Sequence, residues 1–391
     1  MTIGKWARVA IALLPLLVGC KGFWDASAGS TGTGTGSTTA SSGDFYIANI
    51  TGSQLVGYYI NAGVVTALPG SPYAVPAAPI AITIAPDNSF LYASTAAGIY
   101  VYSVASTGQL TLANSGGPIS NDPASSLQVD SSNSWLVEAV SGSPNVYAIQ
   151  LNPTTGVAAS STEQFATLPN STIQQVVISP DNTEVFIAMG AGGTAAVPFN
   201  SANAKPFGAV GNIPVKNAGG AALSVAVDPI VSGQSSPRLV YIGETVATSG
   251  TNTGGLRAFA FSTLKEISGS PYASAGLAPY SILPISSGDY VYVANRQVSG
   301  SSTGVVAGFS ITSTNGVDTL TALGSTFAAG INPQSMAEDS TGTFVLVTDF
   351  GGSPDLKGYT FDTTNAGYLD AVISSQTGTD PVEATAIAVV H

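Results

Sequence analysis

Charged residues are scarce in this chain of 391 residues, since Lys, Arg, Asp and Glu together make up 8% of it, against roughly 25% in an ordinary soluble domain. Helices place Lys, Glu and Arg on their wet faces, so this scarcity argues against a helical bundle. Basic residues number 10 and acidic residues 22. A chain without a basic stripe cannot displace counterions from phosphates, which excludes a nucleic-acid partner.

Apolar residues and glycine are abundant instead. Hydrophobic residues reach 44% and Gly supplies 45 positions. The chain therefore carries enough apolar surface for a core and too little charge to repel itself open, which excludes intrinsic disorder. The frequent Gly, Ser, Thr, Val and Tyr suit strands and turns, so the composition favours an all-β fold.

Cysteine occurs once, at Cys20, and its surroundings indicate an envelope protein. Lys5 and Arg8 precede the apolar run 9–18, which is typical of a secretory signal peptide and too short to span a bilayer. The following Gly19-Cys20 resembles a bacterial lipobox, in which cleavage leaves the cysteine as a lipidated N-terminus. Lys21 stands where an Asp would signal inner-membrane retention. We therefore expect residues 1–19 to be a signal peptide and Cys20 to anchor the protein in the membrane, by resemblance the outer membrane, facing the periplasm or the surface.

The segment after the cysteine has no charge and no apolar residue larger than Ala between residues 26 and 43. Such a Gly/Ser/Thr-rich stretch predicts a flexible tether, which we place at residues 20–43. No thiol remains for a disulfide, so the folded part must be stable through packing.

A repeat governs the chain from residue 44 onward. Its clearest copy, residues 79–114, contains four short strand patterns separated by turns such as Pro86-Asp87-Asn88. Four short antiparallel strands make one blade of a β-propeller. The first strand of the copy recurs six more times, beginning near Ser125, Thr172, Ala222, Ala278, Asn332 and Pro381.

The phase of the repeat predicts how the ring closes. The folded sequence starts with a second strand at Phe45 and ends with a first strand at Val390. The C-terminal strand should therefore complete blade one and leave no free edge. We predict a single all-β domain over residues 44–391, a seven-bladed β-propeller with four antiparallel strands per blade.

The repeated motifs resemble a known family. "LYAST", "YIAN" and "YVAN", "PDN" turns, "GSPYA" at 70–74 and 269–273, and "STGQLT" at 106–111 are similar to those of the lactonase-like seven-bladed propellers. That family includes bacterial 6-phosphogluconolactonase and YVTN-repeat surface proteins. These motifs make turns and pack tyrosines between blades, so they specify the scaffold more than a reaction.

The resemblance implies hydrolysis of a sugar lactone at the mouth of the central channel, by His, Arg and acidic residues. The only histidine is His391, the last residue, where a positioned general base is not expected. Arg238 and Arg257 are expected at loop edges or in outer strands. Arg296, which directly follows "YVAN", is expected where a strand emerges. No catalytic residue is assigned from the sequence, and it leaves open whether the chain is an enzyme.

One constellation stands out at the ends of the second strands. Blades five, six, seven and one present Glu244, Asn295, Asp349 and Asn49 there. Carboxylate and amide oxygens suit Ca²⁺, so these residues are ligand-binding candidates, with Glu244 and Asp349 as metal ligands and Arg296 at the rim. The alternative is that they cap the strand-to-turn transition through local hydrogen bonds.

Two functions remain open from the sequence. The first is a lipid-anchored surface propeller that binds a protein or glycan partner. The second is a lactone hydrolase acting at the channel mouth, with acidic residues and with or without a metal.

Overall fold

The computed structural model describes residues 43–352, 355–373 and 381–391. The predicted signal peptide, Cys20 and nearly all of the predicted tether lie outside the described residues. Within the described part, no helix is long and apolar enough to cross a membrane.

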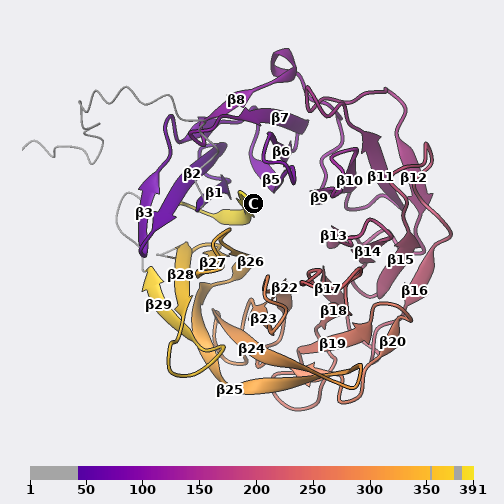
Figure 1. Cartoon of the computed structure of the whole chain (residues 1–391), viewed down its shortest axis with the longest axis vertical. Helices are drawn as coiled ribbons and strands as arrows, with labels where there is room; N and C mark the ends of the chain where they lie inside the picture. The colour runs from indigo at the N-terminus through magenta and orange to yellow at the C-terminus, as the bar shows by residue number, and fades with distance from the viewer. Residues whose placement is uncertain (1–42, 353–354, 374–380) are drawn as a thin grey trace, which may run out of the picture. The chain divides into compact units, whose positions relative to one another are not determined.

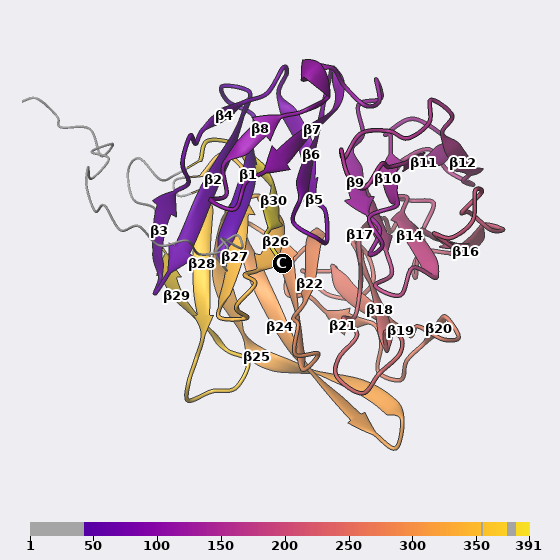
Figure 2. The same ribbon diagram turned by 45° about the horizontal axis from the view of Figure 1, so that its top comes forward.

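Seven antiparallel sheets surround one central axis, as Figure 1 and Figure 2 show. Each sheet has four strands in its main path, so the predicted seven-bladed propeller is confirmed. The innermost strands of blades one to seven are β30 (Ala384–Val389), β5 (Pro79–Ile84), β9 (Ser126–Val129), β13 (Gln175–Ile178), β17 (Ala222–Val227), β22 (Pro279–Pro284) and β26 (Pro333–Glu338). The second strands are β1 (Asp44–Asn49), β6 (Phe90–Thr95), β10 (Trp135–Ala139), β14 (Glu184–Ala188), β18 (Leu239–Glu244), β23 (Tyr290–Asn295) and β27 (Phe344–Asp349).

The two outer layers complete the blades. The third strands are β2 (Gln54–Asn61), β7 (Gly98–Val104), β11 (Asn145–Gln150), β15 (Thr194–Pro198), β19 (Gly255–Ala260), β24 (Thr303–Thr314) and β28 (Leu356–Phe361). The outermost are β3 (Val64–Ala67), β8 (Leu110–Leu112), β12 (Gln164–Thr167), β16 (Gly211–Ile213), β20 (Lys265–Glu266), β25 (Val317–Ile331) and β29 (Leu369–Ile373). The short strands β4 (Tyr73–Ala74) and β21 (Tyr272–Ala273) pair with β2 and β19, and a 3₁₀ turn, η1 (Asn114–Gly116), follows β8.

The ring closes where the repeat predicted. Strand β30 pairs antiparallel with β1, with Phe45 opposite Val389 and Ile47 opposite Ile387. The last strand of the chain is thus the innermost strand of blade one. Because every blade then has a neighbour on each side, no blade exposes a face that needs covering.

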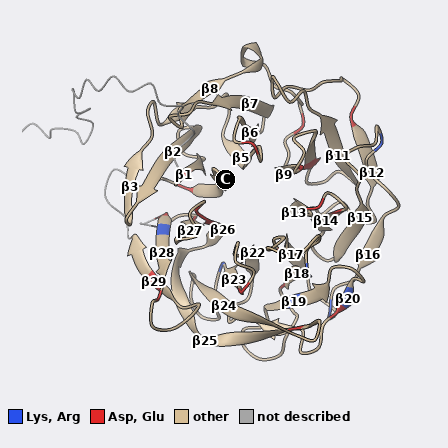
Figure 3. Cartoon of the chain, viewed as in Figure 1, with Lys and Arg blue, Asp and Glu red and all other residues tan. Residues whose placement is uncertain are grey.

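The core is divided among the junctions between blades. Seven clusters of buried apolar side chains form, one at each junction. Both faces of each sheet are covered, so the strands carry apolar side chains on both sides. Figure 3 shows that Lys, Arg, Asp and Glu are thinly scattered over the seven blades, in keeping with the low charged fraction of the chain.

Tyrosines of the second strands link one blade to the next. The hydroxyl groups of Tyr46, Tyr92 and Tyr292 donate hydrogen bonds of 2.6, 2.9 and 2.7 Å to glycine carbonyls of the following blade, those of Gly108, Gly156 and Gly367. The expected packing of tyrosine between blades is confirmed. Each bond satisfies a phenol that would otherwise be buried without a partner.

Candidate functional site

The innermost strands enclose a channel of about 970 Å³. All seven contribute to its wall, which is built mainly from apolar, hydroxyl and amide side chains. The amides come from Gln128, Gln174, Gln175 and Gln334. Among the described residues that line it there is no Lys or Arg. The volume lies within the range of small-molecule sites, about 300–1,000 Å³.

Two of these amides are held in place by the neighbouring blade. The side-chain oxygen of Gln128 accepts a hydrogen bond of 2.8 Å from the backbone N–H of Ile178, and that of Gln175 accepts one of 3.0 Å from Val225. With the oxygen engaged, the NH₂ group of each amide keeps its two hydrogens, which reach no acceptor in the described part of the protein. The channel therefore offers preoriented hydrogen-bond donors without a formal charge.

Arg296 contacts two residues that line the channel near one of its mouths. Its guanidinium group lies on the ring of Tyr280 and donates a hydrogen bond to the side-chain oxygen of Gln334. Tyr280 and Gln334 line the channel and Arg296 does not. Arg296 therefore lies behind the residues that form the rim and not on the rim itself. It acts on the channel by orienting the ring of Tyr280 and the amide of Gln334.

The opposite mouth holds the ionisable groups. Glu338 and Asp339 stand at the end of β26, and His391 follows β30. Asp339 is occupied by the turn that it starts, because its Oδ1 accepts from the N–H groups of Thr343 and Phe344 at 2.8 and 2.6 Å. His391 is tied down through its backbone, which exchanges hydrogen bonds of 2.8 and 2.7 Å with the side chain of Asn88. The terminus is therefore fixed against a neighbouring turn rather than frayed.

The four sequence-predicted strand-end residues lie where expected along the chain, but their side chains turn away from the channel. Asn49, Glu244, Asn295 and Asp349 each end a second strand and are buried. At each of the four, the pairing with the innermost strand contains a register shift. Such a bulge re-aims the side chain next to it. None of the four lines the channel wall.

Three of these side chains bind the preceding blade. Glu244 Oε2 accepts a 2.8 Å hydrogen bond from the backbone N–H of Lys216, which follows β16. The Asn295 amide bonds to Ser274, and Asp349 Oδ1 accepts a 3.1 Å bond from the N–H of Gly330. The structure thus directs these side chains to blade four, blade five and blade six respectively. A joint role of Glu244 and Asp349 in binding a cation stays a prediction.

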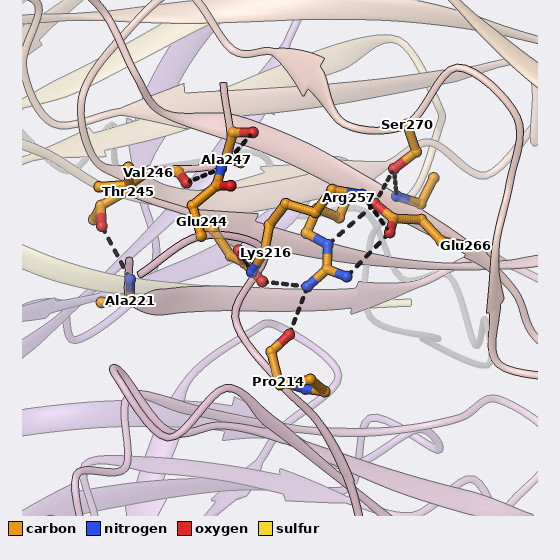
Figure 4. Close-up of polar contacts among 12 residues, drawn as sticks. Pro214, Lys216, Ala221, Glu244, Thr245, Val246, Ala247, Arg257, Glu266 and Ser270 are labelled. Carbon is orange, nitrogen blue, oxygen red and sulfur yellow. Dashed lines mark hydrogen bonds and ion pairs between the residues drawn. The ribbon is translucent and has the colours of Figure 1, made fainter. Parts of the chain in front are cut away.

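Glu244 belongs to an extended ionic network, drawn in Figure 4. Its Oε1 accepts a 2.7 Å bond from Arg257, whose guanidinium also binds both carboxylate oxygens of Glu266 at 3.1 Å. Lys216 adds an ion pair of 2.9 Å to Glu266. Arg257 lies in β19, the third strand of blade five, so the expected outer-strand position is confirmed, but its side chain is buried, with 7% exposed. Its place in the alternating segment Gly255–Ala260 was the signal available in the sequence.

The channel glutamines were missed in the sequence. Gln128, Gln175 and Gln334 all fall in recurring first-strand patterns, where apolar residues alternate with polar ones. The three glutamines stand at different register positions. A polar residue at one shared position, as in Ser126, Gln175, Ser281 and Ser335, was the signal for a hydrophilic channel wall.

A comparison with protein families finds a match to a seven-bladed propeller family. The family described as "Lactonase, 7-bladed beta-propeller" matches residues 57–175. The chain is thus similar to that family over these residues, and its seven blades agree with the family's fold. No match was found for this chain among curated proteins.

Solved structures resemble this chain over most of its length. One is the periplasmic gluconolactonase of Pseudomonas aeruginosa, with 16% identity, a TM-score of 0.65 and coverage of 89% of this chain and 98% of that chain. Another, from Bacteroides fragilis NCTC 9343, is provisionally assigned as a 6-phosphogluconolactonase, with 18% identity, a TM-score of 0.68 and coverage of 90% and 99%. At these identities the likeness concerns the fold.

Proposed function

We propose that this propeller is an envelope protein that binds a neutral, hydroxyl-rich ligand, a sugar or sugar lactone, in its central channel. The observation that carries the proposal is the channel wall of glutamine amides and hydroxyls described above. Carbohydrate hydroxyls both donate and accept hydrogen bonds, and amides offer both functions in one plane. Apolar side chains and the ring of Tyr280 supply surface for the C–H faces of such a ligand.

The charge of the wall distinguishes between related ligands. A sugar phosphate carries about two negative charges near neutral pH, and proteins bind it with Arg, Lys or helix N-termini. The described channel lining contains no basic side chain except His391, and it contains two carboxylates, those of Glu338 and Asp339. An unphosphorylated ligand therefore fits this channel better than a phosphorylated one.

Location is the second part of the proposal. Cys20, which lies outside the described residues, would carry the lipid anchor, and residues 20–43 would tether the propeller to the membrane. A channel open at the end of a flexible tether can sample ligands or surface glycans of the envelope. The lipobox resemblance of Gly19-Cys20 supports this assignment.

A thermal-shift screen of the full chain tests binding. Unphosphorylated aldonolactones and short oligosaccharides should raise the melting temperature of the wild type, because a ligand that binds only the folded state stabilises it. Gln174→Leu should reduce that shift, since Gln174 lines the channel and its side chain bonds no described protein atom. Gln150→Leu, at the exposed end of β11, is the matched control. Equal shifts in both variants would place the ligand elsewhere.

Hydrolysis of a lactone is the second candidate, favoured by Glu338 at the channel mouth. Its carboxylate accepts bonds of 2.6 and 3.1 Å from the N–H and hydroxyl of Ser286. Burial raises the pKa of Glu338, although the bonds from Ser286 oppose the effect. A carboxylate of raised pKa can act as a general base towards water. Ring opening faster than the spontaneous rate, and lost in Glu338→Gln with ligand binding intact, would assign hydrolysis; the spontaneous rate alone would leave binding as the function.

A further inference from the structure

Three carboxylates meet at the junction of blades two and three, away from the channel. Asp122 lies in the connection that leads from blade two into β9, Glu138 lies in β10, and Glu163 directly precedes β12. One oxygen from each lies within 4.8 Å of the other two. Three elements distant in sequence thus bring their acidic groups to one point.

Glu138 is the unusual member of the group. Its side chain is fully buried, with 0% exposure, and neither carboxylate oxygen meets a described residue at full hydrogen-bond geometry. The neutral hydroxyl of Ser120 lies near enough to lower the pKa of Glu138. Its neighbour two positions earlier, Leu136, packs into the apolar core between blades two and three. A carboxylate in such a place costs several kcal/mol unless it is protonated or balanced by positive charge. No ion pair of the described chain supplies that charge, because none involves Asp122, Glu138 or Glu163.

We propose that Asp122, Glu138 and Glu163 form a binding site for a calcium ion that links blade two to blade three. All three ligands are oxygens, which hard cations prefer. Two ligands on opposite sides of Ca²⁺, each at about 2.4 Å, stand about 4.8 Å apart. The observed spread of at most 4.8 Å therefore matches a shared ion of this size.

The surroundings agree with an ion that enters from the solvent. A cavity of about 360 Å³ borders Glu163 and is lined also by Asn114, Ile119 and Ser160. Asp122 and Glu163 are half-buried, so they can exchange water for the ion before Glu138 binds it. Water in the cavity can fill the coordination positions that three carboxylates leave open.

The electrostatics of the junction point in the same direction. Burial raises the pKa of Glu138 to about 8, and the nearby carboxylates of Glu163 and Asp122 add to the effect, while Ser120 opposes it. Burial raises the pKa of Glu163 as well, and the carboxylate of Asp122 adds to the effect. Mutual repulsion of this kind disappears when a divalent cation stands between the groups.

The site differs from the strand-end residues named earlier. At the junctions before blades five, six and seven, Glu244, Asn295 and Asp349 bind protein groups directly. At the junction before blade three, an ion would take the place of those protein donors. The proposal is independent of what the channel binds.

Calorimetric titration of the full chain, stripped of metal by chelation and dialysis, with CaCl₂ tests the site. We expect one Ca²⁺ per chain, with a dissociation constant at or below the millimolar range of extracellular calcium modules. Glu138→Gln should weaken binding about tenfold or more because it removes a charged ligand. Glu184→Gln is the control, since Glu184 is likewise a carboxylate in a second strand whose pKa burial raises, although it is only half-buried.

Further variants keep the test decisive if Glu138→Gln fails to fold. Asp122→Asn and Glu163→Gln change half-buried groups and should each weaken Ca²⁺ binding. No binding by the wild type up to several millimolar Ca²⁺ would overturn the proposal. Ca²⁺ binding that all three variants leave unchanged would also overturn it. If that binding were instead lost in Glu244→Gln or Asp349→Asn, the ion would be assigned to those residues.

Discussion

Arg257 and Glu244 form a buried ion pair in blade five, with 2.7 Å between Nη1 and Oε1 and side chains that are 7% and 1% exposed. The pair joins β18 to β19, and Glu244 also binds the N–H of Lys216 in blade four. A residue that looked like a ligand in the sequence is thus a link between blades. The ionic contact of Arg257 with Glu266 extends the link to the outermost strand.

Removing the cation of this network should destabilise the propeller strongly. Arg257→Met leaves Glu244 buried without its ionic partner, and breaking a buried pair costs about 3–5 kcal/mol. Chemical denaturation followed by circular dichroism measures the loss. Lys265→Met, at an exposed position of β20, should change stability by less than about 0.5 kcal/mol. Equal effects of the two substitutions would contradict the structural role of Arg257.

Asp228 should make stability depend on pH. Burial raises the pKa of Asp228 to about 6, although Tyr241 and Arg238 oppose the effect. An unfolded aspartate has a pKa of about 3.9. The folded state therefore holds the proton more tightly, and the stability that this provides is present below about pH 4 and lost as the pH rises through about 6.

The variant Asp228→Asn isolates this contribution. Its stability relative to the wild type should increase between pH 4 and pH 7 by up to about 3 kcal/mol, because the amide has no charge to bury. Urea denaturation at both pH values gives the comparison, and Tyr241 retains an acceptor in the variant. A difference that is the same at both pH values would show that Asp228 ionises normally in the folded protein.

Strand β30 should be essential to cooperative folding. Ile387 is 8% exposed and packs between blades seven and one, so Ile387→Asp places a charge in that core. We expect a broad, early thermal transition and aggregation. Val372→Asp, at an exposed position of β29, should melt like the wild type. A sharp, unshifted transition for Ile387→Asp would mean that the ring does not depend on this closure.

The lipid anchor predicts where the protein is found. Cys20→Ala removes the only thiol that could be acylated, so the protein should move from the detergent phase to the soluble fraction or remain unprocessed. Fractionation of expressing cells followed by immunoblotting measures this. An unchanged membrane fraction would rule out acylation at Cys20.

The scaffold could be predicted from the sequence because every copy of the repeat must meet the same physical requirements. Each copy needs alternating strands, a turn and a tyrosine, and the phase of the copies determines the pairing of β30 with β1. The direction in which the strand-end side chains point could not be predicted from the sequence. The bulges opposite Asn49, Glu244, Asn295 and Asp349 turn these residues away from the channel, and the last three bind the preceding blade. A bulge leaves no clear mark in a single sequence.

The carboxylates at the second junction illustrate the same limit. Asp122 stands in a connection, Glu138 in a second strand and Glu163 just before an outer strand, with no spacing that resembles a metal motif. Only the packing of blade two against blade three brings them together. Glu138 lies within the short strand β10, and the alternation pattern gives no sign that its carboxylate is buried.

The most direct test of the proposed function is a calorimetric titration of the full chain with an aldonolactone and with its 6-phosphate. Because the channel lining holds two carboxylates and no Lys or Arg, the unphosphorylated lactone should bind more tightly. Gln174→Leu should weaken its binding about tenfold, the cost of roughly one hydrogen bond, while Gln150→Leu should not. Tighter binding of the phosphate, or binding of the lactone that is indifferent to Gln174→Leu, would contradict the account.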